Sequence, residues 1–179
     1  SYLPLCAGLA VKAGMDPFDA LQAITINPAR HLGVEDRVGS LEVGKDADVV
    51  ITEIGGTIGD IESAPFMEAI RQMKWEMGKN AINVHLTYVP YLKAAGELKT
   101  KPTQHSVKEL QSVGIQPDIL ILRTEKHLEE GILKKVASFC NVDLDCVIQS
   151  EDLPSIYEVP VNMQNQGLDT AILRKMDVP

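Results

Sequence analysis

Residues 53–62 read EIGGTIGDIE and follow the apolar residues Val49, Val50 and Ile51, with Thr52 between them. An apolar run that ends in an acid and a glycine-rich turn is typical of a buried parallel strand whose carboxyl end reaches a phosphate and metal site. We therefore expect a strand at residues 49–51 with Glu53 at its end. The sequence after this stretch fits that interpretation, whereas residues 1–48 show a different pattern.

The composition is acidic and aliphatic. Of 179 residues, 45% are hydrophobic and only 4% aromatic, which suits α/β layering better than a β-sandwich. The formal net charge of -8 argues against nucleic acid or an anionic membrane as partner. No apolar run approaches the ~20 residues of a membrane span. No signal-peptide pattern is present either, so we expect a cytoplasmic protein without a membrane partner.

The cysteines and the first residue give further expectations. Cys6, Cys140 and Cys146 form an odd, scattered set, which argues against a disulfide framework and for a reducing compartment. We expect Cys140 and Cys146 to be core thiols. The chain begins with Ser1 rather than Met, which fits a fragment or a trimmed sequence.

Residues 1–48 predict short elements. Residues 3–13 are expected to form a helix that ends at Gly14. Asp16 followed by Pro17 is a helix start, with the acid as N-cap and the proline at the first helical position. A second short helix is expected to begin near Asn27 and to end at Gly33. Residues 41–45 alternate like a strand with a tight turn.

This segment carries a family resemblance. Residues 20–30, ALQAITINPAR, and residues 39–48, GSLEVGKDAD, resemble the C-terminal end of metal-dependent amidohydrolases. In that family the metal ligands lie on barrel strands upstream of this point. His31 is the only histidine of the segment and has no partner at metal-ligand spacing, so we expect a surface or packed histidine and no amidohydrolase activity.

Beyond residue 48, apolar runs alternate with amphipathic segments. Strands are expected at residues 82–89, 118–122 and 145–148, and helices at residues 63–78, 106–113, 128–139 and 167–176. Such alternation predicts an α/β fold, a partial parallel Rossmann-like sheet with flanking helices. Residues 1–48 would add a short helical and β-hairpin appendage at the N-terminus.

A second and longer resemblance covers residues 49–179. The motifs are EIGGTIGDIE at 53–62, GELKTKPTQHSVKEL at 96–110, GIQPDIL at 114–120, FCNV at 139–142, SIY at 155–157 and QGL at 166–168. Together they resemble the second half of the synthetase (amidoligase) domain of CTP synthase. The resemblance implies a P-loop NTPase-like sheet. We therefore expect a chimeric chain of two parts, residues 1–48 and residues 49–179.

The lysine-rich segment is the main candidate site, and its residues are Lys99, Thr100, Lys101, Pro102, Thr103 and Gln104. Pro102 biases Lys101 to an extended backbone, in which Lys99 and Lys101 point the same way. With hydroxyl and amide groups beside them, the two cations make a plausible polyphosphate cradle. Taken alone, the segment fits a solvated loop better than such a cradle, since lysine pairs are commonly surface features. The resemblance implies the site of the substrate UTP and the inhibitor CTP.

Acidic residues supply further candidates. The resemblance places Asp60, Ile61 and Glu62 at the pyrimidine nucleotide, while the two acids also fit an N-terminal cap for the next helix. Glu53 has the location of a magnesium ligand in a nucleotide-binding sheet, or is a turn carboxylate.

Later positions are carried over from the family alone. Lys135 matches a lysine that reaches the uridine nucleotide, and it equally fits an exposed helix lysine. The adenine of ATP is implied near Glu151, Asp152 and Leu153. Three histidines complete the inventory. His85 and His127 are expected to be structural or exposed, and His105 to cap or contact phosphate.

The family reaction is the ATP-dependent amination of UTP to CTP with Mg²⁺. It needs a glycine-rich phosphate loop with its lysine, and the sequence contains no Gly-x-x-x-x-Gly-Lys-Ser/Thr. None of the cysteines lies in a nucleophile motif that would supply ammonia. We therefore assign no catalytic residue and expect little synthetase turnover from this chain alone, with a pyrimidine nucleoside triphosphate as its partner.

Two expectations concern alternatives and assembly. A non-catalytic folding or interaction module is the alternative function, and an amidohydrolase fragment a further one. In the family, the pyrimidine site is shared between subunits, and half of a parallel sheet leaves an exposed edge. We therefore expect a homo-oligomer.

Overall fold

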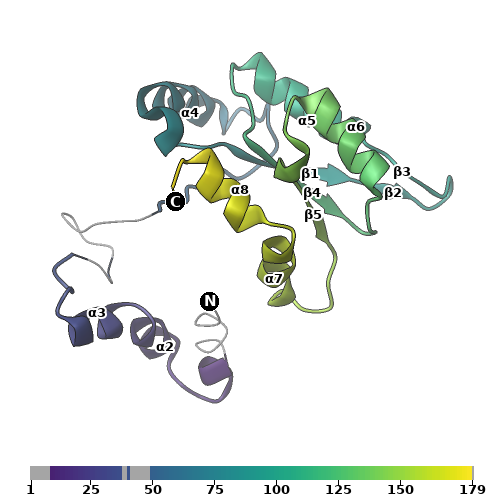
Figure 1. Cartoon of the computed structure of the whole chain (residues 1–179). Helices are drawn as coiled ribbons and strands as arrows, with labels where there is room; N and C mark the ends of the chain where they lie inside the picture. Colours follow the sequence, from purple (N-terminus) through teal and green to yellow (C-terminus); the bar gives the residue numbers. More distant parts are fainter. Residues whose placement is uncertain (1–8, 38–39, 41–48, 179) are drawn as a thin grey trace. The chain divides into compact units, whose positions relative to one another are not determined.

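The computed structural model describes residues 9–37, 40 and 49–178. The chain divides into two units, Ser1–Glu53 and Ile54–Pro179. Figure 1 shows the helices of the first unit in purple and blue, and the sheet and helices of the second in teal to yellow.

The first unit contains α2 (Pro17–Ala23) and α3 (Ile26–Leu32), which pack against each other. The Asp16 side chain accepts hydrogen bonds from the backbone N–H groups of Phe18 and Asp19, as expected of an N-cap. Gly33 ends α3 in the left-handed conformation, with φ at 69°. The helix expected at residues 3–13 is described only from residue 9, and residues 9–12 are helical. The strand and turn expected at residues 41–45 lie outside the described residues.

The second unit is built on a parallel sheet of three strands. These are β1 (Val84–Val89), β4 (Ile119–Thr124) and β5 (Val147–Glu151), in the order β1-β4-β5. Val84 pairs with Ile119, and Leu120 with Val147. β4 is central, and the apolar side chains of this strand are largely buried because the sheet is covered around it. The three strands and the α/β class expected from the sequence are confirmed.

Helices flank this sheet. α5 (Lys101–Ser112) follows β1, and α6 (Glu130–Cys140) follows β4; the two helices contact each other. α7 (Glu158–Asn165) and α8 (Leu168–Lys175) follow β5, and Figure 1 shows them across the sheet from α5 and α6. The core contains Val89, Val107, Ile119, Leu120, Leu122, Leu128, Val136, Ala137, Cys140, Val142, Cys146, Val147, Ile148 and Ala171.

Two of these core residues are the free cysteines Cys140 and Cys146, which confirms the expected thiols; Cys6 lies outside the described residues. Within the described part of the chain, no helix has the length and apolarity needed to cross a membrane.

α4 (Ala64–Met77) precedes the sheet and confirms the helix expected there. Its Lys74 ammonium lies 3.1 Å from the Asp118 carboxylate at the start of β4 and also donates to the carbonyl of Ala81. None of the residues of α4 is buried. The amphipathic pattern therefore predicted a helix correctly, but its apolar side chains are not part of the core.

Some short elements were not expected. β2 (Tyr91–Leu92) and β3 (Glu97–Leu98) form an antiparallel pair between β1 and α5. α7 contains Pro160 in its first turn, where a missing N–H costs no helical hydrogen bond. Two short 3-10 helices, Gly78–Asn80 and Leu144–Cys146, complete the unit.

The strand expected at residues 49–51 is wrong. These residues have no regular structure, and Ile51 is 90% exposed. A strand needs a neighbour that satisfies its backbone groups, and within the described residues the sheet contains β1, β4 and β5 only. An apolar run by itself does not make a strand.

The extended backbone expected at Lys101 is also wrong. Lys101 is the first residue of α5, which begins five residues before the expected start at Ser106. Pro102 lies in the first turn of this helix, where proline is tolerated because the first N–H groups have no intrahelical partner. Lys99 and Lys101 therefore do not lie along one extended segment.

Candidate functional site

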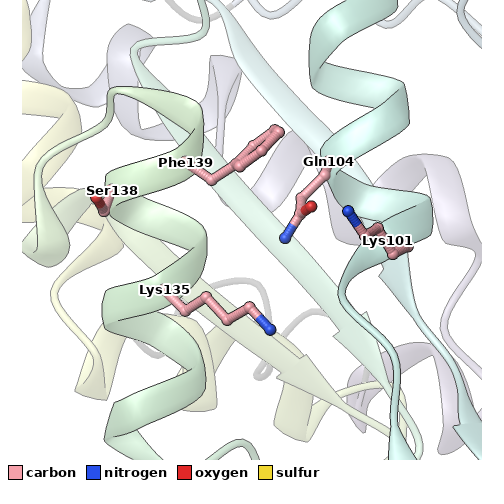
Figure 2. Close-up of a pocket in the computed structure, with 5 residues that line it drawn as sticks. All are labelled: Lys101, Gln104, Lys135, Ser138 and Phe139. Carbon is pink, nitrogen blue, oxygen red and sulfur yellow. The ribbon is translucent and has the colours of Figure 1, made fainter.

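A pocket lies between α5 and α6. It has a volume of about 390 Å³ and is lined by Lys101 and Gln104 from α5 and by Lys135, Ser138 and Phe139 from α6. Figure 2 shows the lysine side chains, the Gln104 amide and the Phe139 ring projecting into the space between the two helices. Because both helices follow parallel strands of one sheet, residues distant in sequence meet here.

Lys101 and Lys135 make this pocket electropositive. Within the described residues, neither ammonium has a carboxylate partner, whereas the neighbouring Lys134 pairs with Glu130 at 2.7 Å. Lys101 is also at the N-terminus of α5, where unpaired backbone N–H groups and the helix dipole favour an anion. The pocket therefore offers two cations and a helix N-terminus to a negatively charged ligand.

The other residues of the lysine-rich segment are held in place locally. Lys99 pairs with Glu97 at 2.5 Å and does not line the pocket. Thr100 is the N-cap of α5, and its hydroxyl accepts a hydrogen bond from the Gln104 amide at 3.2 Å. This bond orients Gln104, which is 3% exposed, at the wall of the pocket.

Thr103 faces the sheet. Its hydroxyl donates to the Tyr88 carbonyl at 3.0 Å and lies 3.1 Å from the Thr87 hydroxyl, and the residue is fully buried. Thr103 thus fastens α5 to β1. Pro102 is exposed in the first turn of the helix.

The acidic loop at residues 54–62 lies away from the lysines. The Asp60 carboxylate accepts a hydrogen bond from the backbone N–H of Thr57 at 2.7 Å, and Gly59 has φ at 98° beside the Glu109 side chain. Glu109 is about two turns along α5 from Lys101. Ile61 is 91% exposed, and Glu62 is exposed too. One chain therefore does not bring these acids into the pocket.

Glu53 belongs to the first unit and is exposed. Because the strand expected before it is absent, its carboxylate is not delivered by a strand end.

The carboxyl ends of β4 and β5 carry a second polar cluster. The Glu151 carboxylate lies 2.6 Å from His127 Nδ1, at hydrogen-bonding distance, and the Asp152 carboxylate lies 3.9 Å from Arg123 Nε. The Asp152 N–H donates to the Thr124 carbonyl, which fixes the start of the loop that contains Leu153. In open α/β sheets, ligands bind outside these strand ends.

β1 contributes two titrating groups near these sites. Tyr88 donates its phenolic hydrogen to Glu125 at 2.9 Å, and this hydrogen bond raises the pKa of Tyr88. His85 lies on the face of β1 that packs against α5, 2.8 Å from the Ser106 hydroxyl, and burial lowers its pKa. The structural role expected of His85 fits this contact.

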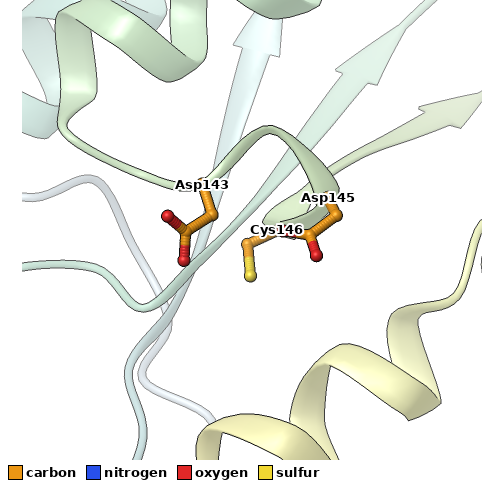
Figure 3. A group of neighbouring side chains, drawn as sticks. All are labelled: Asp143, Asp145 and Cys146. Atoms are coloured by element: carbon orange, nitrogen blue, oxygen red, sulfur yellow. The ribbon is translucent and has the colours of Figure 1, made fainter.

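Asp143, Asp145 and Cys146 form a third cluster, drawn in Figure 3. Their potential ligand atoms lie within 4.8 Å of one another. Lys175 pairs with Asp143, and Arg174 pairs with Asp145 and donates to the Cys146 sulfur.

Each charged group of this cluster already has a partner of opposite charge. Burial raises the pKa of the Cys146 thiol, so it stays protonated near neutral pH. The charges of both acids are matched by cations of α8, and the cluster fastens this helix to the segment before β5.

Sequence reasoning missed the pocket's Ser138 and Phe139, and also Lys108, whose ammonium lies 5.2 Å from the centroid of the Phe139 ring. A signal was available. Ser138 and Phe139 follow Lys135 by three and four residues, the spacing that places side chains on one helix face.

Comparison with known proteins agrees with this architecture. The protein-family model described as CTP synthase N-terminus matches residues 20–178. The chain belongs to this CTP synthase family. The chain is 72% identical over 132 residues to a CTP synthase of Bacteroides thetaiotaomicron, and this match covers 74% of the chain and 25% of that protein. A CTP synthase of Porphyromonas gingivalis is 68% identical over 129 residues, which is 72% of the chain and 24% of that protein.

A third CTP synthase, from Clostridium perfringens, is 58% identical over 155 residues, covering 85% of the chain and 29% of that protein. The chain thus spans about a quarter of the length of the curated relatives it matches. The family match begins at residue 20, inside the segment for which we expected an amidohydrolase origin. These matches give the amidohydrolase part of our expectation no support.

Proposed function

We propose that the chain binds a pyrimidine nucleoside triphosphate, UTP or CTP, in the pocket between α5 and α6. The observation that carries this proposal is the meeting of Lys101 and Lys135, from two helices, without a carboxylate partner in the described chain. Two ammonium groups and a helix N-terminus suit a triphosphate, and Phe139 offers a π-face on which a base can stack. Membership in the CTP synthase family supports the choice of nucleotide.

The family reaction, the ATP-dependent amination of UTP, is proposed here as the context of this binding. ATP would lie at the carboxyl ends of the strands, at Glu151, Asp152 and Leu153, with Arg123 beside them. The sequence contains no Gly-x-x-x-x-Gly-Lys-Ser/Thr motif. Phosphoryl transfer depends on such a preorganised clamp, so we propose binding without turnover by this chain alone.

Mg²⁺ would accompany the nucleotides. Mg²⁺ is usually held by one or two carboxylates together with substrate phosphates. The exposed carboxylate of Glu53 is our candidate for the carboxylate ligand. The exposed Asp60, Ile61 and Glu62 would reach the nucleotide of another copy, because in one chain their loop lies beside Glu109.

Isothermal titration calorimetry with CTP and UTP, each with Mg²⁺, tests the proposal. Lys101→Ala and Lys135→Met should each weaken binding about 10- to 100-fold, since each removes a charge-assisted contact. Lys134→Met is the matched control, because Lys134 lies next to Lys135 but pairs with Glu130 outside the pocket. Absence of heat at millimolar nucleotide would favour the alternative, a non-catalytic folding or interaction module.

We further propose that residues 1–48 form a segment that the nucleotide-binding part of the chain does not need. The division of the chain after Glu53 supports such a separate segment. A chain that starts at residue 49 should keep the CTP affinity and the unfolding midpoint of the full chain. A large loss of either would show that the segment is part of the nucleotide-binding fold.

A further inference from the structure

Lys108 contacts an aromatic residue of the pocket from outside it. Its ammonium lies 5.2 Å from the centroid of the Phe139 ring, within the range of a cation–π interaction. Lys108 lies one turn after Gln104 on α5, so the contact joins the two helices that form the pocket. Lys108 itself does not line the pocket.

The Phe139 ring lies outside the hydrophobic core. Phe139 is 40% exposed and is not among the apolar residues that form the core or pack against it. Within the described part of the chain, Lys108 has no carboxylate that competes for its ammonium. The cation therefore lies over the same ring that lines the pocket.

We propose that Lys108 is a positioning residue, which holds the Phe139 ring across the pocket so that it receives the flat base of a nucleotide. This inference rests on the proposed function of the pocket and adds a division of labour to it. Lys101 and Lys135 bind the phosphates, whereas Lys108 acts on the base through Phe139. A cation that touched phosphate directly would have a different signature.

The test compares two ligands with the full chain by titration calorimetry. CTP carries both a base and phosphates, and inorganic tripolyphosphate carries phosphates only. Lys108→Met should weaken CTP binding about two- to fivefold and leave tripolyphosphate binding unchanged. Lys108→Arg should retain the CTP affinity, since a guanidinium also interacts with the ring face. Lys134→Met controls for the loss of one positive charge.

A double-mutant cycle decides whether Lys108 acts through the ring. In a Phe139→Leu background, Lys108→Met should cause no further loss of CTP affinity. Additive losses, or an equal loss of tripolyphosphate binding, would overturn the positioning role while leaving the proposed function in place. A wild-type chain that binds neither ligand, or binds tripolyphosphate but not CTP, would overturn both. Thermal unfolding of each variant shows that it is folded.

Discussion

His85 shows what a single burial does at the residue scale. It lies on β1 against α5, bonded to Ser106, and burial lowers its pKa from the ordinary value of 6.5. The unfolded chain, in which His85 titrates normally, therefore binds more protons than the folded chain just below pH 6.5. The contribution of neutral His85 to the free energy of unfolding is therefore fully present above this pH. It is lost as the pH falls towards the lower pKa of His85 in the folded state.

We predict that His85→Gln makes the stability of the chain less dependent on pH between pH 7 and about pH 5. Glutamine can bond to Ser106 but does not titrate. The measurement is the unfolding midpoint followed by circular dichroism across this pH range. His105→Gln is the control, since His105 is an exposed histidine of α5, the helix that packs against His85. The prediction is contradicted if the unfolding midpoint of the wild-type chain stays constant as the pH is lowered below 6.5. It is also contradicted if the midpoint of the variant decreases by the same amount.

At the scale of elements, the site depends on how α5 is seated. Thr103 is fully buried and its hydroxyl reaches both the Tyr88 carbonyl and the Thr87 hydroxyl, so one side chain links helix to strand. The same turn of α5 carries Lys101 and Gln104 into the pocket. The motif in this segment therefore contains two kinds of residue, those that line the pocket and one that fastens the helix to the strand.

We predict that Thr103→Val lowers the free energy of unfolding by about 1–3 kcal/mol. Valine keeps the shape of the side chain but leaves the Thr87 hydroxyl and the Tyr88 carbonyl without this partner in a buried place. Urea denaturation measures the change. Thr170→Val, at an exposed position of α8, should change the free energy by no more than about 0.5 kcal/mol. A Thr103→Val chain as stable as the wild type would show that these bonds contribute little.

Elements with a local cause could be predicted from the sequence. The apolar runs of β1, β4 and β5 gave the sheet, and Asp16 and Gly33 gave the ends of α2 and α3. Residues 49–51 have the same apolar character as a strand but pair with no strand among the described residues, which a local pattern cannot reveal. Likewise, Pro102 fits both an extended segment and a first helical turn, and only the packing of α5 on β1 decides between them.

The same limit applies to the candidate site. Lys101, Gln104 and Lys135 could be proposed from motifs, and the structure places all three in one pocket. Lys108 and Phe139 meet because α5 and α6 lie side by side at a particular rotation about their axes. That rotation depends on the buried residues of both helices, so a local sequence motif cannot predict it.

At the scale of the whole molecule, the two edges of the sheet differ. The edge of β5 is covered, because the Gln166 amide bonds to both the N–H and the carbonyl of Gln149. On β1, Val84, Leu86 and Tyr88 point to one face and are 43%, 62% and 44% exposed. An apolar edge strand of this kind favours pairing with another chain, which supports the homo-oligomer that we propose.

We predict that Leu86→Lys reduces self-association, because a lysine on an edge strand opposes pairing by charge and by hydration. Sedimentation velocity over a range of protein concentrations should show larger species for the wild-type chain and mainly monomer for the variant. Leu92→Lys is the control, since Leu92 is also an exposed leucine, at 43%, but belongs to the separate β2–β3 pair. If the wild-type chain were monomeric, or if both variants associated as it does, then β1 would not be the contact surface.

Since the exposed Asp60 and Glu62 lie apart from Lys101 within one chain, loss of association in Leu86→Lys should also weaken CTP binding, whereas Leu92→Lys should not.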